Sequence, residues 1–517
     1  MNGMPLALLC PLAIGLAATP SPDFASLEKV VQEELRETGT PGAAVAVVSG
    51  EQIVFAKGFG VASVETGAPV GDGMLFQVGS MTKTFTAAAI VSLAEEGRLR
   101  MDAPIGTYVQ GLAPRLGRLT MHQLLSQTSG LRDEGADYGS QDEAALGATI
   151  RAWTEDRLLL EPGKAFSYSN PGFSLAGLVL ETIEGKPYAD VIEERILKPL
   201  GMGRSTFRPT RAMTHPLAVG HSGERDRPHV VRPMANDTRH WPAGYLYSSI
   251  QDLARFAGAF QNEGRLEGKQ VLSPAVIVKM STPYAEFPPT FDGGAYGYGL
   301  FMDDARGIRV AGHGGQMPGF SAEWRFVPSR RVAVIVLANR EGLMFRRTVA
   351  QALEPHLPPV PARPGAPSVP MTTEEMTRYA GRYVGRWSME LLVKQGALFL
   401  KWGGGERPVT KIEGGRFLAS REVGDPVEFR IVPGADGRPE YLQMFLWVFR
   451  REGISATPVA RGTWWRGDLR KATEANRRSL SVADVADILV DISSGSPMLR
   501  GIWALARPLA RRVLPWQ

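Results

Sequence analysis

The sequence predicts a mixed α/β (α+β) fold, in which a sheet flanked by helices carries a helical insert and is followed by a small all-β domain. Three observations lead to this prediction. An apolar hairpin pattern lies near the N-terminus, at residues 42–58. Four further strand-like runs lie between residues 296 and 337 and can complete the same sheet. The stretch between them, residues 102–285, has mostly helical periodicity and is expected to form the insert.

The early elements are expected in a definite order. Residues 24–37 should form a helix, because leucine and valine recur there at helical spacing. Apolar runs at residues 42–48 and 53–58 flank a Ser-Gly-Glu-Gln turn, which predicts an antiparallel hairpin. An alanine-rich run over residues 83–97 ends in Glu-Glu-Gly and predicts a second helix that the glycine closes.

A proline-rich stretch divides the chain into two parts. Residues 357–370 contain repeated prolines and predict a stiff, extended linker. Residues 371–455 alternate short strands with glycine-containing turns, which favours a small antiparallel sheet or barrel. We therefore expect a main domain over residues 19–356, this β domain, and a C-terminal tail over residues 456–517.

Residues 1–18 resemble a secretory signal peptide. An apolar run over residues 6–17 ends in small residues, although the preceding segment lacks Lys and Arg. We expect export to the periplasm or the medium; the alternative is a short uncleaved anchor. The sole cysteine, Cys10, falls inside this segment, so the mature chain would have no disulfide and no cysteine-based metal site.

Composition and charge are those of an ordinary globular protein. The 517 residues are 44% hydrophobic and 21% charged, with a net charge of +5. Long Lys/Arg runs are absent outside the tail, so nucleic acid is not an expected partner. Within the tail, Arg500, Arg507 and Arg511 would share one helical face opposite an apolar one. Peripheral membrane contact and docking onto the protein are both open for this segment, which Pro508 interrupts.

The sequence Ser80-Met-Thr-Lys83 is the first candidate for catalysis. A spacing of three residues places the two side chains on one helical face, where the lysine can take the proton of the serine. The lysine pKa would have to fall by about three units, and burial against Phe76, Val78 and Phe85 could lower it. The alternative is a chance pair on a solvated helix face.

The second candidate is Tyr168-Ser-Asn170, which precedes an apolar-periodic run typical of a helix. A tyrosine and an asparagine two residues apart at a helix start can both face a cleft. The phenol could then accept or shuttle a proton, and the amide could bind substrate and the lysine. The alternative is an exposed turn in which the asparagine caps the helix.

The third candidate is His313-Gly-Gly-Gln316, which follows a short strand. Gly314 and Gly315 allow the backbone to approach a substrate closely. The backbone N–H groups of Ser80 and Gln316 could together hold an oxyanion, and His313 could relay a proton or bind a carboxylate. The alternative is a glycine-rich hairpin without a catalytic role.

Competing sites are weak. His215, His221, His229 and His240 gather in a polar stretch without the spacing of metal ligands, so no metal and no cofactor are expected. The chain also contains no Gly-x-Ser-x-Gly nucleophile motif and no phosphate-binding loop.

Taken together, the motifs resemble those of the serine β-lactamase and penicillin-recognising hydrolase family, of the class C β-lactamase, D-aminopeptidase and family VIII esterase type. The resemblance covers about residues 24–353. It is carried by the stretches at residues 80–83, 124–130, 168–170, 244–249 and 313–315. It implies an antiparallel sheet flanked by helices. The order of strands and helices along the chain itself predicts a site in the cleft between the sheet domain and the helical insert.

The resemblance also implies roles for the candidate residues. Ser80 would be the acylated nucleophile, with Lys83 and Tyr168 as the general-base pair and Asn170 as an orienting group. Ser80 and Gln316 would form the oxyanion hole.

One departure from the family pattern bears on the substrate. His313-Gly-Gly stands where a β-lactamase usually has Lys-Thr-Gly, so a fixed cation for a carboxylate is missing. We therefore predict an exported serine hydrolase that cleaves small-molecule or peptide esters or amides through an acyl-enzyme. The alternatives are a D-aminopeptidase, a D-Ala carboxypeptidase or a weak β-lactamase. A different class is a non-catalytic receptor for peptidoglycan or peptides.

Overall fold

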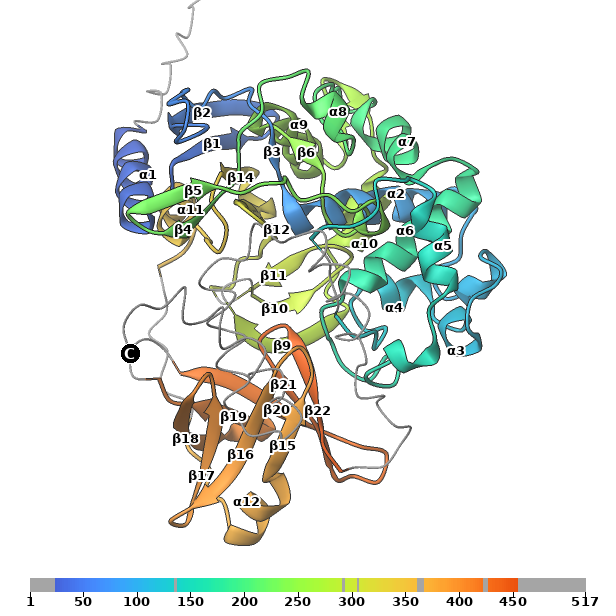
Figure 1. Cartoon of the computed structure of the whole chain (residues 1–517), viewed down its shortest axis with the longest axis vertical. Coiled ribbons are helices and arrows are strands. Elements are labelled where there is room, and N and C mark those ends of the chain that lie inside the picture. Colours follow the sequence, from blue (N-terminus) through green and yellow to red (C-terminus); the bar gives the residue numbers. More distant parts are fainter. Residues whose placement is uncertain are drawn as a thin grey trace, which may run out of the picture. The chain divides into compact units, whose positions relative to one another are not determined.

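The computed structural model describes residues 24–133, 137–290, 293–304, 306–359, 367–421 and 426–453. These lie within one compact unit, Met1–Ile454. The expected signal peptide with Cys10, the C-terminal tail and residues 360–366 of the expected linker lie outside the described residues. The described part contains a large sheet with flanking helices and a closed barrel (Figure 1), which confirms the predicted fold class.

The large sheet joins the early and the late strands, as predicted. Its eight antiparallel strands follow the order β2-β1-β14-β13-β12-β11-β10-β9. Val45 of β1 pairs with Val336 of β14, so the N-terminal hairpin docks directly onto the last strand of the domain. The strands are β1 Gly42–Ser49, β2 Gln52–Gly60, β9 Ala285–Thr290, β10 Gly293–Tyr296, β11 Phe301–Asp303, β12 Val310–Met317, β13 Phe320–Val327 and β14 Val332–Ala338.

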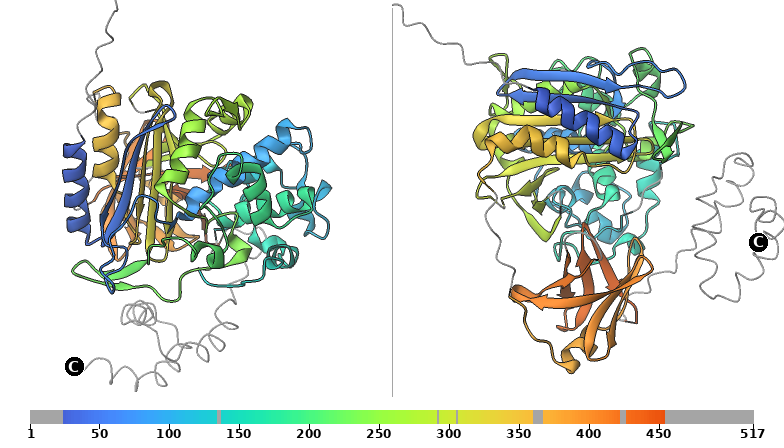
Figure 2. Two further views of the ribbon diagram at one scale, coloured as in Figure 1. Left: turned by 90° about the horizontal axis from the view of Figure 1, so that it is seen from above. Right: turned by 90° about the vertical axis from the view of Figure 1, so that its left-hand side faces the viewer.

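Helices cover both faces of this sheet, which explains why its central strands are apolar on both sides. On β1, Val45 and Val47 belong to the core under α1 (Ala25–Thr38) and α11 (Arg346–Leu353). Ala44 and Ala46 belong to the larger core on the opposite face. Figure 2 shows the two layers, with α1 and α11 on one side of the sheet and the remaining helices on the other.

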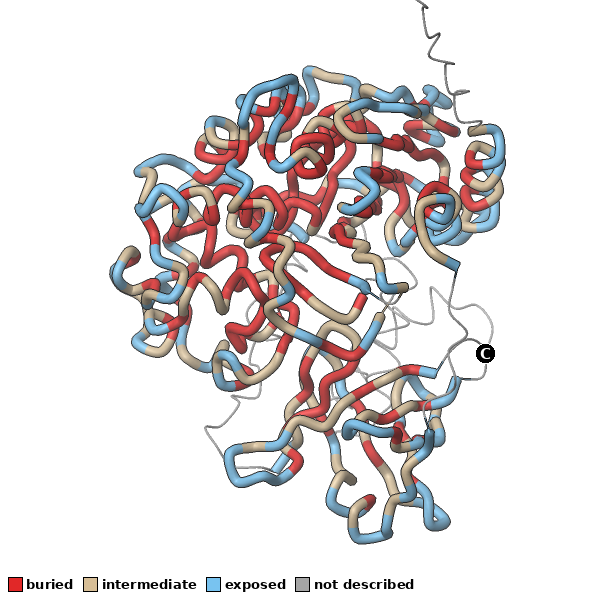
Figure 3. Tube along the Cα trace, turned by 180° about the vertical axis from the view of Figure 1, so that it is seen from behind, coloured by how far each residue is buried: buried red, intermediate tan, exposed pale blue. Residues whose placement is uncertain are grey.

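The predicted helical insert, residues 102–285, is present between α2 (Thr82–Glu95) and β9. Nearly every residue of α2, which precedes the insert, is buried. Figure 3 shows buried segments in the interior of the molecule and exposed ones at its periphery. The other helices are α3 Pro114–Gly117, α4 Met121–Leu125, α5 Ala145–Arg151, α6 Asn170–Glu184, α7 Tyr188–Ile192, α8 Pro209–Ala212, α9 Ile250–Gln261 and α10 Pro274–Met280. Short strand pairs join β3 Phe76–Gln77 to β6 Tyr247–Ser248, β4 His221–Glu224 to β5 Arg227–Val230, and β7 Arg265–Leu266 to β8 Lys269–Gln270.

The C-terminal β domain is a closed antiparallel barrel with its own apolar core. It begins with α12 (Thr373–Tyr379) and closes by pairing its first strand with its last. The strands are β15 Gly381–Val384, β16 Ser388–Lys394, β17 Ala397–Trp402, β18 Gly405–Ile412, β19 Arg416–Ala419, β20 Val427–Pro433, β21 Pro439–Met444 and β22 Trp447–Arg451. Within the described ranges, no helix has the length and apolar character needed to cross a membrane.

The β21–β22 hairpin of the barrel contacts the segment before α6. Gln443 Nε2 donates to the Phe166 carbonyl at 2.9 Å, and the Tyr168 N–H donates to the Leu446 carbonyl at 2.7 Å. Val448 N also donates to Ser167 Oγ at 3.3 Å. The barrel is thus hydrogen-bonded to the backbone that carries Tyr168.

The sheet core should dominate the stability of the main domain. Ile335 lies in β14 and is fully buried, so Ile335→Ala would leave a cavity and is expected to lower the free energy of unfolding by about 3 kcal/mol. Val278 of α10 is 65% exposed, and Val278→Ala should change it by less than about 0.5 kcal/mol. Urea unfolding followed by circular dichroism measures both; equal effects would contradict the assignment of the core.

Candidate active site

Ser80 lies in the turn that connects strand β3 to helix α2. It is the middle residue of a 3₁₀ turn, Gly79–Met81, that follows β3 and runs directly into α2. Gly79 has a φ of +53°, a conformation that favours glycine. The serine is therefore held at a helix start, where unpaired backbone N–H groups and the helix dipole favour a developing negative charge.

Lys83 is fully buried one turn into α2. Burial lowers the pKa of its amine to about 7, against a smaller opposing effect of the Asp133 carboxylate. Its Nζ lies 4.8 Å from the centre of the Tyr168 ring and 5.6 Å from that of Phe173. In a substantial fraction of the molecules, Lys83 is thus a neutral amine near neutral pH. This is the form that can accept a proton.

The partners of Lys83 fit a neutral amine, which has two N–H donors and one lone pair. Its Nζ lies 2.7 Å from Asn170 Oδ1 and 2.6 Å from the Ala243 carbonyl oxygen, and both of these atoms can only accept. Ser80 Oγ, 2.9 Å away, is the one partner that can donate. In the protonated form Lys83 can donate to all three partners; in the neutral form the two carbonyls can occupy its N–H groups and leave its lone pair for the serine hydroxyl.

Tyr168 and Asn170 reach the same place from the start of α6. Ser169 caps this helix by accepting from the Gly172 N–H at 3.2 Å, so Asn170 is its first residue rather than its cap. The Tyr168 ring is almost completely buried beneath Lys83. Gln127, in a left-handed conformation, accepts from the Ser169 N–H at 2.9 Å and holds this segment in place.

Strand β12 passes so close to the Ser80 turn that only glycine fits at the two points of contact, Gly315 and Gly79. A Cβ on Gly315 would lie 1.9 Å from the Val78 carbonyl oxygen and 3.0 Å from the Ser80 nitrogen. A Cβ on Gly79 would lie 2.6 Å from the Gln316 nitrogen. The backbone nitrogens of Ser80 and Gln316 thus belong to adjoining segments, as an oxyanion hole requires.

The Gln316 side chain is engaged elsewhere. Its Nε2 donates to the Leu343 carbonyl at 2.6 Å, and its Oε1 accepts from Ser321 Oγ at 3.0 Å and from the Gly342 N–H at 2.8 Å. These bonds attach β12 to the loop after β14. What Gln316 can offer a substrate is therefore its backbone.

His313 is placed differently from the expectation. Its ring is buried, Nδ1 donates to the Gly314 carbonyl at 2.5 Å, and Nε2 accepts from the Tyr296 hydroxyl at 3.1 Å. Burial and the nearby Lys83 hold its pKa well below the usual range, so the ring is neutral. Because protein groups occupy both nitrogens, the arrangement does not favour His313 as a proton relay or a carboxylate ligand. It packs against Phe301 and Tyr168 as part of the wall of the site.

Three residues that the sequence analysis missed complete the site. Asp133 accepts from both the N–H and Nδ2 of Asn170, each at 3.0 Å. Its other oxygen accepts from Trp447 Nε1 at 2.9 Å and from Arg386 Nη1, and both of these donors belong to the barrel. No spacing pattern connects residues that are 253 and 314 positions apart, so the sequence offered no signal for this contact.

These residues surround a cavity of about 580 Å³. Ser80, Tyr168 and Asn170 line it, Gly314 and Gly315 form part of the wall from β12, and Leu446 and Trp447 close it from the barrel. Its mouth is acidic, because Asp137 and Glu341 also line it. Partial burial and Glu341 raise the pKa of Asp137, whereas Arg386 lowers it.

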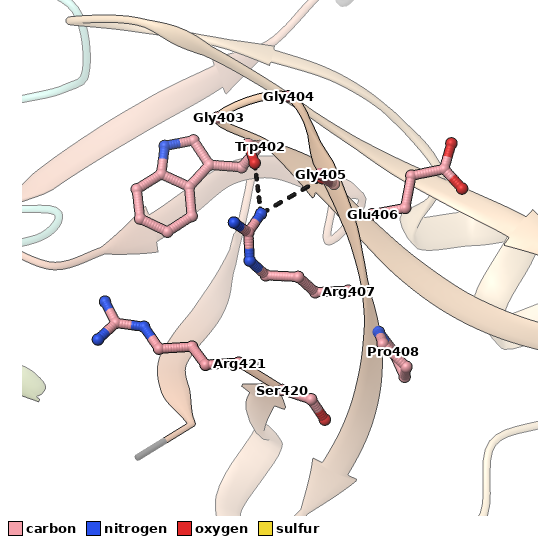
Figure 4. A pocket seen from close by; sticks show the side chains of 9 residues that line it. All are labelled: Trp402, Gly403, Gly404, Gly405, Glu406, Arg407, Pro408, Ser420 and Arg421. Atoms are coloured by element: carbon pink, nitrogen blue, oxygen red, sulfur yellow. Dashed lines mark hydrogen bonds between the residues drawn. The ribbon is translucent and has the colours of Figure 1, made fainter. Parts of the chain in front are cut away.

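A second cavity, of about 740 Å³, lies on the barrel at the β17–β18 hairpin (Figure 4). Its Arg407 packs over Trp402 and donates to the carbonyls of Trp402 and Gly405. None of the residues lining it forms a nucleophile and base pair like Ser80 and Lys83. The chemistry that this fold can support is therefore at the smaller cavity.

Comparison with known proteins matches both the fold and the site region. The family model described as Beta-lactamase matches residues 27–356. Protein flp of Staphylococcus aureus (strain N315) is 27% identical over 321 residues, which are 60% of this chain and 62% of flp. The match thus spans less than two thirds of flp. Penicillin-binding protein 4 of Amycolatopsis lactamdurans is 29% identical over 348 residues, 64% of this chain and 91% of that protein.

Among solved structures, SurE is similar with a TM-score of 0.66 and 26% identity, over 82% of this chain and 98% of SurE. That share exceeds what residues 27–356 can supply, so the likeness extends into the barrel. The family model covers well over half of the chain, and it coincides with the domain that holds Ser80 and Lys83. The chain therefore belongs to the β-lactamase family.

Proposed function

We propose that the protein hydrolyses esters or amides through an acyl-enzyme formed on Ser80. The observation that carries this proposal is the contact between the Ser80 hydroxyl and a buried amine whose pKa is about 7. A serine is a weak nucleophile until a nearby base accepts its proton, and Lys83 is in place to do so.

The proposed reaction uses these groups in turn. The neutral Lys83 amine takes the Ser80 proton while Oγ attacks the substrate carbonyl carbon. The oxygen that becomes negative is stabilised by the backbone N–H groups of Ser80 and Gln316. The leaving alcohol or amine then departs with the proton that Lys83 took from Ser80, and we propose the Tyr168 phenol as the relay for this proton. Water adds to the acyl-enzyme by the reverse proton movements and releases the acid and free Ser80.

The environment of β12 supports esters and amides over β-lactams. In place of a lysine cation, β12 carries His313, which is neutral, buried and bonded to Tyr296 and Gly314. A β-lactam or a D-Ala-terminated peptide presents a carboxylate, which gains nothing from a neutral ring. Arg386 is the cation at this cavity, and it is already paired with the Asp133 carboxylate.

A second candidate is an aminopeptidase that acts on D-amino acid amides or esters with a free amino group. Asp137 and Glu341 line the cavity mouth, and Glu341 accepts from two neutral donors, Ser222 Oγ at 2.5 Å and the Gly319 N–H at 3.1 Å. Two carboxylates at the mouth favour a protonated amine. SurE, the structurally similar protein, has been crystallised with D-Leu, which carries such an amine.

We also propose that the enzyme is exported, on the composition of residues 1–18, and that its partners are small-molecule or peptide substrates. Nucleic acid is not part of this proposal. Peripheral membrane contact through the C-terminal tail stays a prediction from its composition.

Covalent labelling tests the nucleophile. A fluorophosphonate probe should label the wild-type protein, and Ser80→Ala should abolish labelling because no other serine contacts a buried amine among the described residues. Ser92→Ala is the matched control: Ser92 lies on the same helix, its hydroxyl donates to the Ala88 carbonyl, and labelling should persist. Absence of label from the wild type with probes of both ester and β-lactam type would instead favour the receptor.

The pH dependence of labelling tests the base. Because only the neutral Lys83 accepts a proton, the labelling rate should rise with pH, with a midpoint at about 7, and level off above it. Lys83→Arg, which stays charged, should lose at least a hundredfold in rate at every pH. A wild-type midpoint near the ordinary lysine value of about 10 would contradict the role of the buried amine.

The acidic mouth yields a test of the second candidate. If it operates, the p-nitroanilide of D-alanine should be cleaved in preference to its N-acetylated form. The combined change Asp137→Asn and Glu341→Gln should then reduce this preference about tenfold by removing two charges. The control is Asp226→Asn, because Asp226 lies in the exposed β4–β5 turn. Equal cleavage of the two anilides by the wild type would leave the esterase proposal and remove the aminopeptidase.

A further inference from the structure

Asp133 connects the barrel to the catalytic lysine. Its side chain is only 2% exposed, yet both oxygens are fully engaged. Oδ1 accepts two hydrogen bonds from Asn170, and Oδ2 accepts one from Trp447 and one from Arg386. One carboxylate oxygen thus faces the hydrolase domain and the other faces the barrel.

On the hydrolase side, Asp133 fixes the direction of the Asn170 amide. A carboxylate accepts but cannot donate, so the Asn170 NH₂ group points to Asp133 and its carbonyl oxygen points away. That oxygen lies 2.7 Å from Lys83 Nζ. If the amide turned over, an N–H would face the Lys83 amine and remove one of its two acceptors.

On the barrel side, Arg386 supplies the opposite charge. It lies in the turn between β15 and β16, and its guanidinium packs over the Trp447 ring at 4.9 Å. The same indole donates to Asp133, so cation and donor are held together. A buried carboxylate without a cation is costly, and the Asp133 charge favours the protonated form of Lys83.

The other titratable groups around this pair do not take over that task. Burial, together with the charge of Lys83, lowers the pKa of His313 on β12 and of His240 beside α6. Both rings are therefore neutral. Asp137 and Glu341 at the cavity mouth are themselves acids, and Arg386 acts on Asp137 as well. Among the described residues, Arg386 is the cation that is hydrogen-bonded to Asp133.

We propose that Arg386 and Trp447 of the barrel are positioning residues for catalysis, which hold Asp133 paired so that Asn170 stays oriented and Lys83 stays neutral. The barrel thereby helps to keep Lys83 in the form that acts as the general base, although Arg386 and Trp447 act through Asp133 and not on Ser80 directly. This inference rests on the proposed function, because it assumes that Lys83 is the base.

Removal of the barrel charge tests the proposal. In Arg386→Gln, the unpaired Asp133 should favour the lysine cation, and the midpoint of the fluorophosphonate labelling rate should move up by about one pH unit. Arg386→Lys keeps a cation and should retain the wild-type midpoint. Adding Asp133→Asn to Arg386→Gln removes both charges and should bring the midpoint back to the wild-type value or below it.

Arg382→Gln is the matched control. Arg382 also belongs to the barrel, on β15, but its side chain is 55% exposed and pairs with Glu452, so the midpoint should not change. A purely structural role for Arg386 would lower the plateau rate and leave the midpoint in place, which would overturn the proposal. Circular dichroism identifies variants that do not fold, and Arg386→Lys then carries the test. If the proposed function itself were wrong, the wild-type protein would not be labelled at Ser80. That result differs from an unchanged midpoint in Arg386→Gln.

Discussion

The burial of one amine is the constraint on which the rest of the site depends. Lys83 can act as a base near neutral pH only if water is kept from it, and burial of a lysine is tolerated only if its N–H groups find acceptors. The chain meets both conditions by making α2 buried on nearly all sides and by bringing Asn170 and the Ala243 carbonyl to the amine. A helix that was amphipathic in the ordinary way would leave this lysine exposed and charged.

The sheet contributes to the site through its backbone, which closely approaches the Ser80 turn, rather than through its side chains. β12 can pass beside the Ser80 turn because Gly315 has no Cβ to meet the Val78 carbonyl, and Gly79 has none to meet Gln316. The Gln316 side chain is hydrogen-bonded to the loop after β14. These bonds hold β12 so that the Gln316 backbone faces the serine. The precision of the oxyanion site thus arises from backbone packing, and a neutral His313 fills the space where a charged group would disturb the lysine.

Local patterns in the sequence were sufficient to predict the fold class and the contact between Ser80 and Lys83. Ser80 and Lys83 are three residues apart on one helix, and the strands that build the sheet are apolar runs with clear turns, so both signals are short-range. The role of His313 could not be judged in this way, because it depends on Tyr296 and on burial. Asp133 escaped notice for the same reason: its partners lie 37 and 253 residues away, and an aspartate in a loop has no pattern of its own.

The barrel is better understood as part of the electrostatic balance of the site than as an appendage. The main domain buries the Asp133 carboxylate, whose charge raises the pKa of a lysine that has to remain neutral. These two requirements conflict if the pair is alone, because an unpaired negative charge favours the protonated form of a nearby amine. A third, permanently charged group resolves the conflict. Arginine suits this purpose because its guanidinium keeps its proton under all ordinary conditions. The structural likeness to SurE extends into the barrel, and in this chain the contact at Asp133 gives a physical reason for joining the barrel to the main domain.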